Sequence, residues 1–128
     1  MIAPASAQVL RKLDNWTVYR SKDNFTGQVS CRIISRKGSL GTAFLTVEKN
    51  EVVFLINRTP KVIRWRLDDG EVHTTTSKTL FFGLNRVLEA TRLRVHVTNT
   101  RDEVHNYDFQ LTGLSDALKL LDRPDCRN

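Results

Sequence analysis

A chain of 128 residues with 40% hydrophobic and 27% charged residues has the composition of a single folded domain that builds its core without metal ions. Its apolar runs fall short of the roughly 20 residues that span a bilayer, so no transmembrane segment is predicted. The formal net charge of +6 predicts attraction to acidic surfaces, but charge alone does not identify a nucleic-acid-binding protein.

The first eight residues, 1–8, are predicted to be a signal-peptide remnant or a disordered tail, and residues 9–128 a single β-rich domain. Ala5-Ser6-Ala7 matches the A-x-A pattern that precedes a signal-peptidase cleavage site. The charged and apolar regions of a complete signal do not precede it, so the alternative is an alanine-rich tail. We expect the protein to be periplasmic or secreted.

Two strands are predicted near the start of the domain, at residues 16–19 and 29–34, with a polar turn between them. Residues 9–13 are too few to assign to a helical turn or an extended segment. In the second strand, alternation places Cys31 on the apolar face and directs it toward the core. A basic turn at residues 35–39 follows.

Residues 42–56 are predicted to form a hairpin that turns at Lys49-Asn50. This turn makes three apolar pairs: Val47 with Val52, Leu45 with Phe54, and Phe44 with Leu55. Both faces are then apolar over much of their length, which is typical of strands that are covered on two sides.

A second hairpin is predicted at Asp69-Gly70, a dipeptide that suits a type I′ turn because both residues tolerate positive φ. The turn makes these pairs: Leu67 with Val72, Trp65 with Thr74, and Ile63 with Thr76. The opposite face then carries four polar residues: Arg64, Arg66, His73 and Thr75. The hairpin is therefore expected to be half-buried with a basic outer side.

Residues 92–111 are predicted to form a third hairpin with these pairs: Leu93 with Phe109, Val95 with Tyr107, and Arg94 with Asp108. Apolar residues then face apolar residues, and opposite charges face each other. His96 and His105 fall on opposite faces in this register, and His73 lies in another hairpin. No metal site is therefore predicted.

Two helices are predicted, a short one at residues 84–90 and a C-terminal one. The second has an apolar stripe at helical spacing, formed by Leu114, Ala117, Leu118 and Leu121. We expect Thr112 or Ser115 to cap it and Pro124 to end it. The predicted fold class is mainly β, an antiparallel β-sandwich or open barrel of about seven to eight strands with a short helix and a C-terminal helix packed on it.

The two cysteines, Cys31 and Cys126, enclose most of the predicted domain. In an exported protein such a pair is expected to form a disulfide, whereas the alternative in the cytosol is two buried free thiols. The C-terminal helix would bring Cys126 toward Cys31, so the predicted bond holds that helix on the sheet.

Catalytic motifs are absent from the sequence. It contains no G-x-S-x-G motif, and neither cysteine has a histidine beside it in sequence. The adjacent carboxylates Asp68 and Asp69 are accounted for by the tight turn at which they lie. The chain is therefore expected not to be an enzyme and to use no cofactor.

Five basic residues are predicted to line a contact surface: Lys61, Arg64, Arg66, Arg92 and Arg94. Trp65 points to the other side of its strand, so the stacking surface of a single-strand nucleic-acid binder is missing. We expect a monomer whose partner is an unidentified protein or an acidic component of the envelope or host, rather than nucleic acid. The alternative is a solvated face that keeps the sheet soluble.

The order of these features resembles the invasion-associated locus B proteins, which are exported by Gram-negative bacteria. The resemblance is carried by Trp16, Cys31, the serial hairpins, and the closing pattern Tyr107-x-Phe109-x-Leu111-x-Gly113-Leu114-x-x-Ala117-Leu118 with Cys126. It implies a periplasmic or surface-associated β-sandwich-like domain linked to host-cell invasion. Members of that family are usually longer, and many have another cysteine where this chain has Tyr19-Arg20.

We therefore expect an exported, non-catalytic interaction protein associated with host invasion or virulence. One alternative is a periplasmic inhibitor, or an immunity-type binder, of a secreted hydrolase. Another is a basic nucleic-acid-binding domain, which predicts steeply salt-dependent affinity for DNA or RNA.

Overall fold

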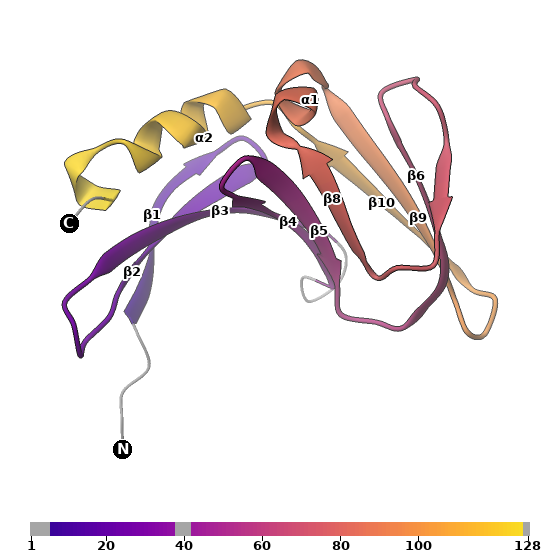
Figure 1. Ribbon diagram of the computed structural model, residues 1–128, viewed down its shortest axis with the longest axis horizontal. Coiled ribbons are helices and arrows are strands. Elements are labelled where there is room, and N and C mark those ends of the chain that lie inside the picture. Colours follow the sequence, from indigo (N-terminus) through magenta and orange to yellow (C-terminus); the bar gives the residue numbers. More distant parts are fainter. Residues whose placement is uncertain (1–5, 38–41, 127–128) are drawn as a thin grey trace.

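The computed structural model describes residues 6–37 and 42–126, and its strands form two antiparallel sheets (Figure 1). The larger sheet contains, in spatial order, β1 (Ser6–Leu13), β2 (Trp16–Lys22), β3 (Val29–Lys37), β4 (Ala43–Glu48), β5 (Glu51–Ile56) and β8 (Thr79–Gly83). The smaller sheet contains β10 (Val104–Gln110), β9 (Arg92–Asn99), β6 (Pro60–Leu67) and β7 (His73–Thr75). The helices are α1 (Leu84–Glu89), α2 (Leu114–Leu121) and the short 3₁₀ helix η2 (Pro124–Cys126). The predicted fold class is confirmed.

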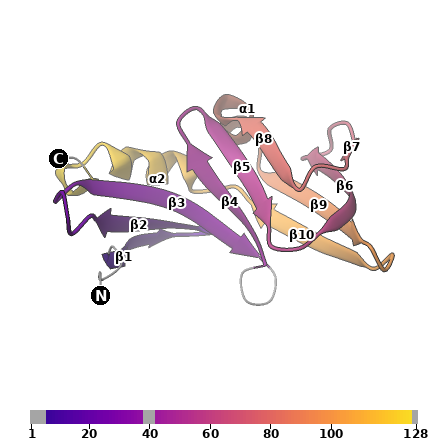
Figure 2. The same cartoon turned by 60° about the horizontal axis from the view of Figure 1, so that its bottom comes forward.

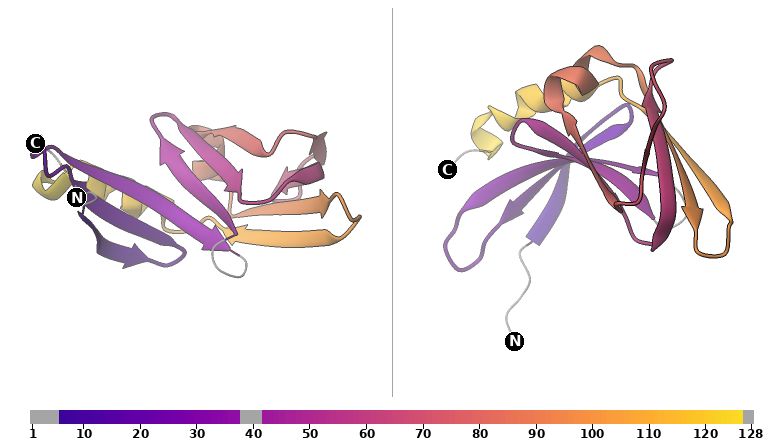
Figure 3. Two further views of the ribbon diagram at one scale, coloured as in Figure 1. Left: turned by 90° about the horizontal axis from the view of Figure 1, so that it is seen from below. Right: turned by 45° about the vertical axis from the view of Figure 1, so that its right-hand side comes forward.

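One face of the larger sheet is covered by two layers that lie side by side (Figure 1 and Figure 3). α2 packs against β1, β2 and β3, and the smaller sheet covers the part that contains β5 and β8. Edge-to-face ring contacts join Phe54 to Phe109 at 6.0 Å and Phe82 to Trp65 at 4.8 Å between centroids. The buried residues under both layers form one continuous core.

The structure adds two strands to those predicted, β1 and β8, and both lie at the edges of the larger sheet (Figure 2). β1 begins at Ser6, so residues 6–8, which were predicted to belong to a tail, are part of a strand. The predicted basic turn at 35–39 is wrong for residues 35–37, which continue β3. The rest of that turn and residues 1–5 lie outside the described residues.

The first and third hairpins have the predicted registers. Leu45 pairs with Phe54 across β4 and β5, and Leu93 pairs with Phe109 across β9 and β10. All four side chains are completely or almost completely buried. A shift by one residue would move each of these apolar sets to the opposite face, which is why the pattern specifies the register.

The predicted register of the second hairpin is wrong by one residue. Trp65 pairs with His73 instead of Thr74, and the residue at positive φ in this turn is Asp68, at φ 50°. The cause lies outside the hairpin, because the Asp68 carboxylate accepts hydrogen bonds from Thr91 and from the backbone of Arg92. These contacts with the start of β9 place the turn one residue earlier than the Asp69-Gly70 dipeptide suggests.

The shifted register moves His73 and Thr75 away from the basic outer side. Both now lie on the same side of the smaller sheet as Trp65 and Ile63, and the His73 ring stacks on Trp65 with centroids 4.3 Å apart. The predicted polar face therefore keeps its two arginines on β6 and loses its two residues on β7.

α2 begins without the predicted side-chain cap. Its N-cap is Gly113 in the left-handed region at φ 95°, so neither Thr112 nor Ser115 has that role. A Cβ at Gly113 would lie 3.2 Å from the carbonyl oxygen of Leu13, and both features favour glycine here. No helix among the described residues is long and apolar enough to cross a membrane.

Trp16 connects the N-terminal strands to the segment that precedes α2. Its side chain is completely buried, and its indole N–H donates a hydrogen bond of 3.2 Å to the carbonyl oxygen of Leu111. This bond joins residues that are 95 positions apart. A buried carbonyl without a donor costs free energy, so the indole nitrogen is as important as the ring.

We expect Trp16→Phe to lower the free energy of unfolding by about 2–4 kcal/mol, because it leaves a small cavity and an unpaired buried carbonyl. Urea denaturation measures the loss. The matched control is Trp65→Phe, since Trp65 is only half-buried and donates no indole hydrogen bond among the described residues. An equal or larger loss in the control would contradict the role of the Trp16 N–H.

Candidate functional site

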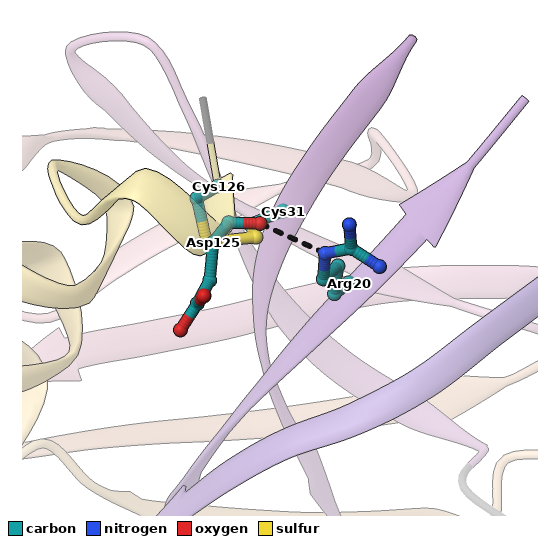
Figure 4. Close-up of a disulfide and its surroundings, with 4 residues drawn as sticks. All are labelled: Arg20, Cys31, Asp125 and Cys126. Carbon is teal, nitrogen blue, oxygen red and sulfur yellow. Dashed lines mark hydrogen bonds between the residues drawn. A yellow bond between two sulfur atoms is a disulfide. The ribbon is translucent and has the colours of Figure 1, made fainter. Parts of the chain in front are cut away.

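The predicted disulfide between Cys31 and Cys126 is present, with the two Cα atoms 5.4 Å apart (Figure 4). Beside it the Nε–H of Arg20 donates a 2.8 Å hydrogen bond to the carbonyl oxygen of Asp125. Arg20 and Cys31 are partners across β2 and β3, so both contacts hold η2 against the same pair of strands. The disulfide and this hydrogen bond therefore fix η2, the segment that follows α2.

The outer side of the smaller sheet carries a group of basic residues that we call the arginine face: Arg64 and Arg66 on β6 with Arg92, Arg94 and His96 on β9. In the register of these strands Arg64 lies opposite His96, and Arg66 lies opposite Arg94. The alternation of the strands explains this grouping, since the intervening residues point to the core. Four of the five residues of the predicted contact surface thus lie together.

Three members of the predicted contact surface, Lys61, Arg92 and Arg94, have carboxylate partners. Arg92 binds both carboxylate oxygens of Asp108 through its Nε and Nη2 atoms. Lys61 lies where the pairing of β6 is irregular and forms a 2.8 Å ion pair with Asp102. Lys61 is therefore not part of the arginine face.

Arg94 is partly neutralised. Its Nη2 atom donates to the carbonyl oxygen of Asp68 at 2.8 Å and to the Asp69 carboxylate at 3.2 Å. The Asp69 side chain is 100% exposed, so this ion pair is weak. The Arg94 side chain is 28% exposed, and its Nε–H is buried without a hydrogen-bond partner in the described part of the chain.

Arg64 and Arg66 have no acidic partner among residues 6–37 and 42–126. Arg64 is exposed, whereas Arg66 is half-buried and its Nε–H lacks a partner within the same residues. Together with Arg94 and His96 they line a pocket of about 190 Å³, to which Trp65 and Val72 also contribute. In the described part of the chain the pocket thus brings together Arg64 and Arg66, which lack an acidic partner, and the partly neutralised Arg94.

Asp68 joins the end of β6 to the start of β9. Its Oδ1 atom accepts hydrogen bonds from the Thr91 hydroxyl at 2.9 Å and from the backbone N–H groups of Thr91 and Arg92 at 3.0 Å. The Thr91 hydroxyl is the main cause of a lowered pKa for the Asp68 carboxyl, and the positive charge of Arg94 acts in the same direction.

Asp108 is the second carboxylate of the region with a lowered pKa. The side-chain hydrogen bonds from Arg92 are the main cause, and the positive charges of Arg92, Arg94 and Lys37 add to it. Both carboxylates are therefore ionised far below neutral pH and hold the arginines around them in place.

Sequence reasoning missed two contributors to this site. It gave His96 no role, although the alternation Arg92, Arg94, His96 along β9 already places it among the arginines. It explained Asp68 by the turn alone, whereas the structure ties that residue to β9. The contacts of Asp68 with Thr91 and Arg92 join residues more than 20 positions apart, so the local sequence carries no signal of them.

The three histidines lie apart from one another, because strand pairing places each beside different neighbours. His96 lies opposite Asn106 and His105 opposite Val97, as predicted, while His73 stacks on Trp65. Within the described residues there is no group of three or more His, Cys, Asp or Glu side chains that could hold a metal ion.

No family model matches the chain, and neither curated proteins nor solved structures show a significant similarity to it. The resemblance to the invasion-associated locus B proteins stays a prediction.

Removal of the disulfide by the double substitution C31S/C126S should lower the free energy of unfolding by about 4–5 kcal/mol, because the bond closes a loop across a separation of 95 residues. Urea denaturation with and without dithiothreitol measures this loss. Reduction should destabilise the wild-type protein to a similar extent and leave the double variant unchanged. A loss below about 1 kcal/mol would show that noncovalent contacts suffice to hold η2.

Acid should destabilise the protein through Asp68. Because its pKa is lower in the folded state, the ionised carboxylate stabilises the fold above the ordinary pKa of about 3.9, and this contribution disappears as the pH falls through the lower folded-state value. Asp68→Asn should cost about 1–2 kcal/mol at pH 6, and progressively less as the pH falls below about 3.9. Urea denaturation of the wild type and the variant between pH 6 and pH 2.5 measures the difference in the free energy of unfolding.

Thr91→Val is the matched variant for this test, since it removes the hydroxyl that contributes most to the lowered pKa of Asp68. Its stability curve should approach that of the wild type as the pH falls. Curves for both variants that run parallel to the wild-type curve down to pH 2.5 would contradict the assignment.

Proposed function

We propose that the protein is an exported, non-catalytic interaction protein that binds an acidic partner protein through the arginine face. The observation that carries this proposal is the lack of acidic partners for Arg64 and Arg66 among the described residues. Arginines that serve only to keep a sheet soluble need no neighbours of the same charge. Here Arg66 lies directly opposite Arg94, and like charges directly opposite each other cost stability.

Two features support export. Disulfides persist in oxidising compartments and are rare in the cytosol, and this chain contains one that links Cys31 to Cys126. The A-x-A pattern at Ala5-Ser6-Ala7 is typical of the end of a secretion signal. The resemblance to the invasion-associated locus B proteins extends the proposal to an association with host-cell invasion.

An acidic protein is preferred to nucleic acid because, among the described residues, no Phe, Tyr or Trp occupies an outward position of the arginine face on β6 or β9. The nearest aromatic residue in the strand, Trp65, stacks on His73 and meets the edge of Phe82 on the core side. The four arginines of this face instead present hydrogen-bond donors at the spacing of alternate strand residues. Such a surface suits carboxylates that project from another protein.

Charge reversal in R64E/R66E should weaken binding to an immobilised hexaglutamate peptide by at least about tenfold at 150 mM salt, because it removes the two uncompensated cations. Biolayer interferometry measures the affinity. The matched control is K12E/R32E, which changes the net charge by the same amount but lies on the outer side of the larger sheet, where both residues are exposed.

Equal loss of affinity in the two variants would contradict a specific face, because net charge alone would then explain the binding. A 12-nucleotide single-stranded DNA serves as the competing probe. Tighter binding of the DNA than of hexaglutamate, with steep salt dependence, would overturn the proposal in favour of a nucleic-acid binder.

A further inference from the structure

The pocket between Arg64, Arg66, Arg94 and His96 is large enough to hold a single charged group. Its volume of about 190 Å³ is several times the roughly 30 Å³ that a water molecule occupies in the liquid, and it is smaller than the roughly 300–1,000 Å³ of pockets for drug-sized ligands. The head of one acidic side chain therefore fits.

The electrostatics of the pocket favour an anion. Two strands bring Arg66 and Arg94 directly opposite each other, and Arg64 joins them from the next outward position of β6. Against these three charges the described residues supply carboxylates near Arg94 but none that pairs with Arg64 or Arg66. Asp69, which is fully exposed, forms an ion pair with Arg94, and Asp108 lies opposite Arg94 across β9 and β10. A carboxylate placed in the pocket would meet several donors that the protein itself leaves unused.

The same sheet contains an internal example of the contact that such a ligand would make. Arg92 binds Asp108 side-on, with its Nε–H and one terminal N–H directed at the two carboxylate oxygens. In Arg66 and Arg94 the corresponding Nε–H is buried and has no partner in the described part of the chain. A buried donor without a partner costs about 1–3 kcal/mol, and native proteins contain few of them.

From these observations we infer that the pocket binds one carboxylate of an acidic side chain on the partner, held side-on by Arg66 or Arg94 in the manner of Asp108 on Arg92. Arg64 and His96 also line the pocket, where Arg64 adds a positive charge and both side chains can donate hydrogen bonds. Because the Nε–H groups are buried, the guanidinium turns toward the ligand when it binds. This inference rests on the proposed function, since it names the group that the arginine face recognises.

The test separates side-on binding from simple charge attraction. Arg66→Lys keeps the positive charge but removes the Nε–H and the planar pair of donors, and lysine does not replace arginine at such a contact. We expect R66K to weaken hexaglutamate binding at least about fivefold, and R32K, on the other sheet, to leave it unchanged. In parallel, ¹⁵N NMR follows the Nε–H signals of Arg66 and Arg94, of which at least one should shift on titration with hexaglutamate and not with hexaglutamine.

An affinity for R66K within about twofold of the wild type, with both Nε–H signals unmoved, would overturn the side-on carboxylate contact. The charge-reversal result above would still stand, so the two proposals fail separately. Inorganic phosphate is the competing probe of the same pocket. Larger shifts of the Nε–H signals with phosphate than with hexaglutamate at equal concentration would also overturn the assignment to a carboxylate.

Discussion

The apolar face of the six-stranded sheet has to be covered across its whole width, and no helix among the described residues can do this alone. Six strands about 4.8 Å apart span about 24 Å, whereas the eight residues of α2 extend for about 12 Å. The smaller sheet covers the rest. The other main features of the fold follow from this division, because each covering layer must be attached to strands that are distant in sequence.

The two layers are attached in different ways, and the difference has consequences for function. α2 is held on both sides, by the Trp16–Leu111 hydrogen bond before it and by the Cys31–Cys126 disulfide after it. The smaller sheet needs only its inner side for the core. Its outer side is free to carry charge, and the hydrogen bonds of Asp68 keep the strands that bear the arginines in register.

The sequence pattern predicted the pairing of strands correctly where burial of apolar side chains in the core selects the register. In the first and third hairpins a slip by one residue would expose residues such as Phe54 and Phe109, so alternation alone was sufficient. The second hairpin is only half-buried, and there a contact between Asp68 and Thr91 outweighed the local preference of Asp69-Gly70 for the turn. The cap of α2 was missed for a similar reason, since Gly113 is favoured by the closeness of Leu13.

By itself the sequence determined eight of the ten strands among the described residues, the two α-helices, the side of the strand on which Cys31 lies, and the alternation that groups the arginines, because all of these depend on residues close together in the chain. Only the tertiary structure decided that β9 pairs with β6, which places Arg66 opposite Arg94 and leaves Arg64 without an acid among the described residues. Pairing between distant strands is selected by the fit of whole apolar faces. The charge of the pocket is therefore a property of the assembled sheet.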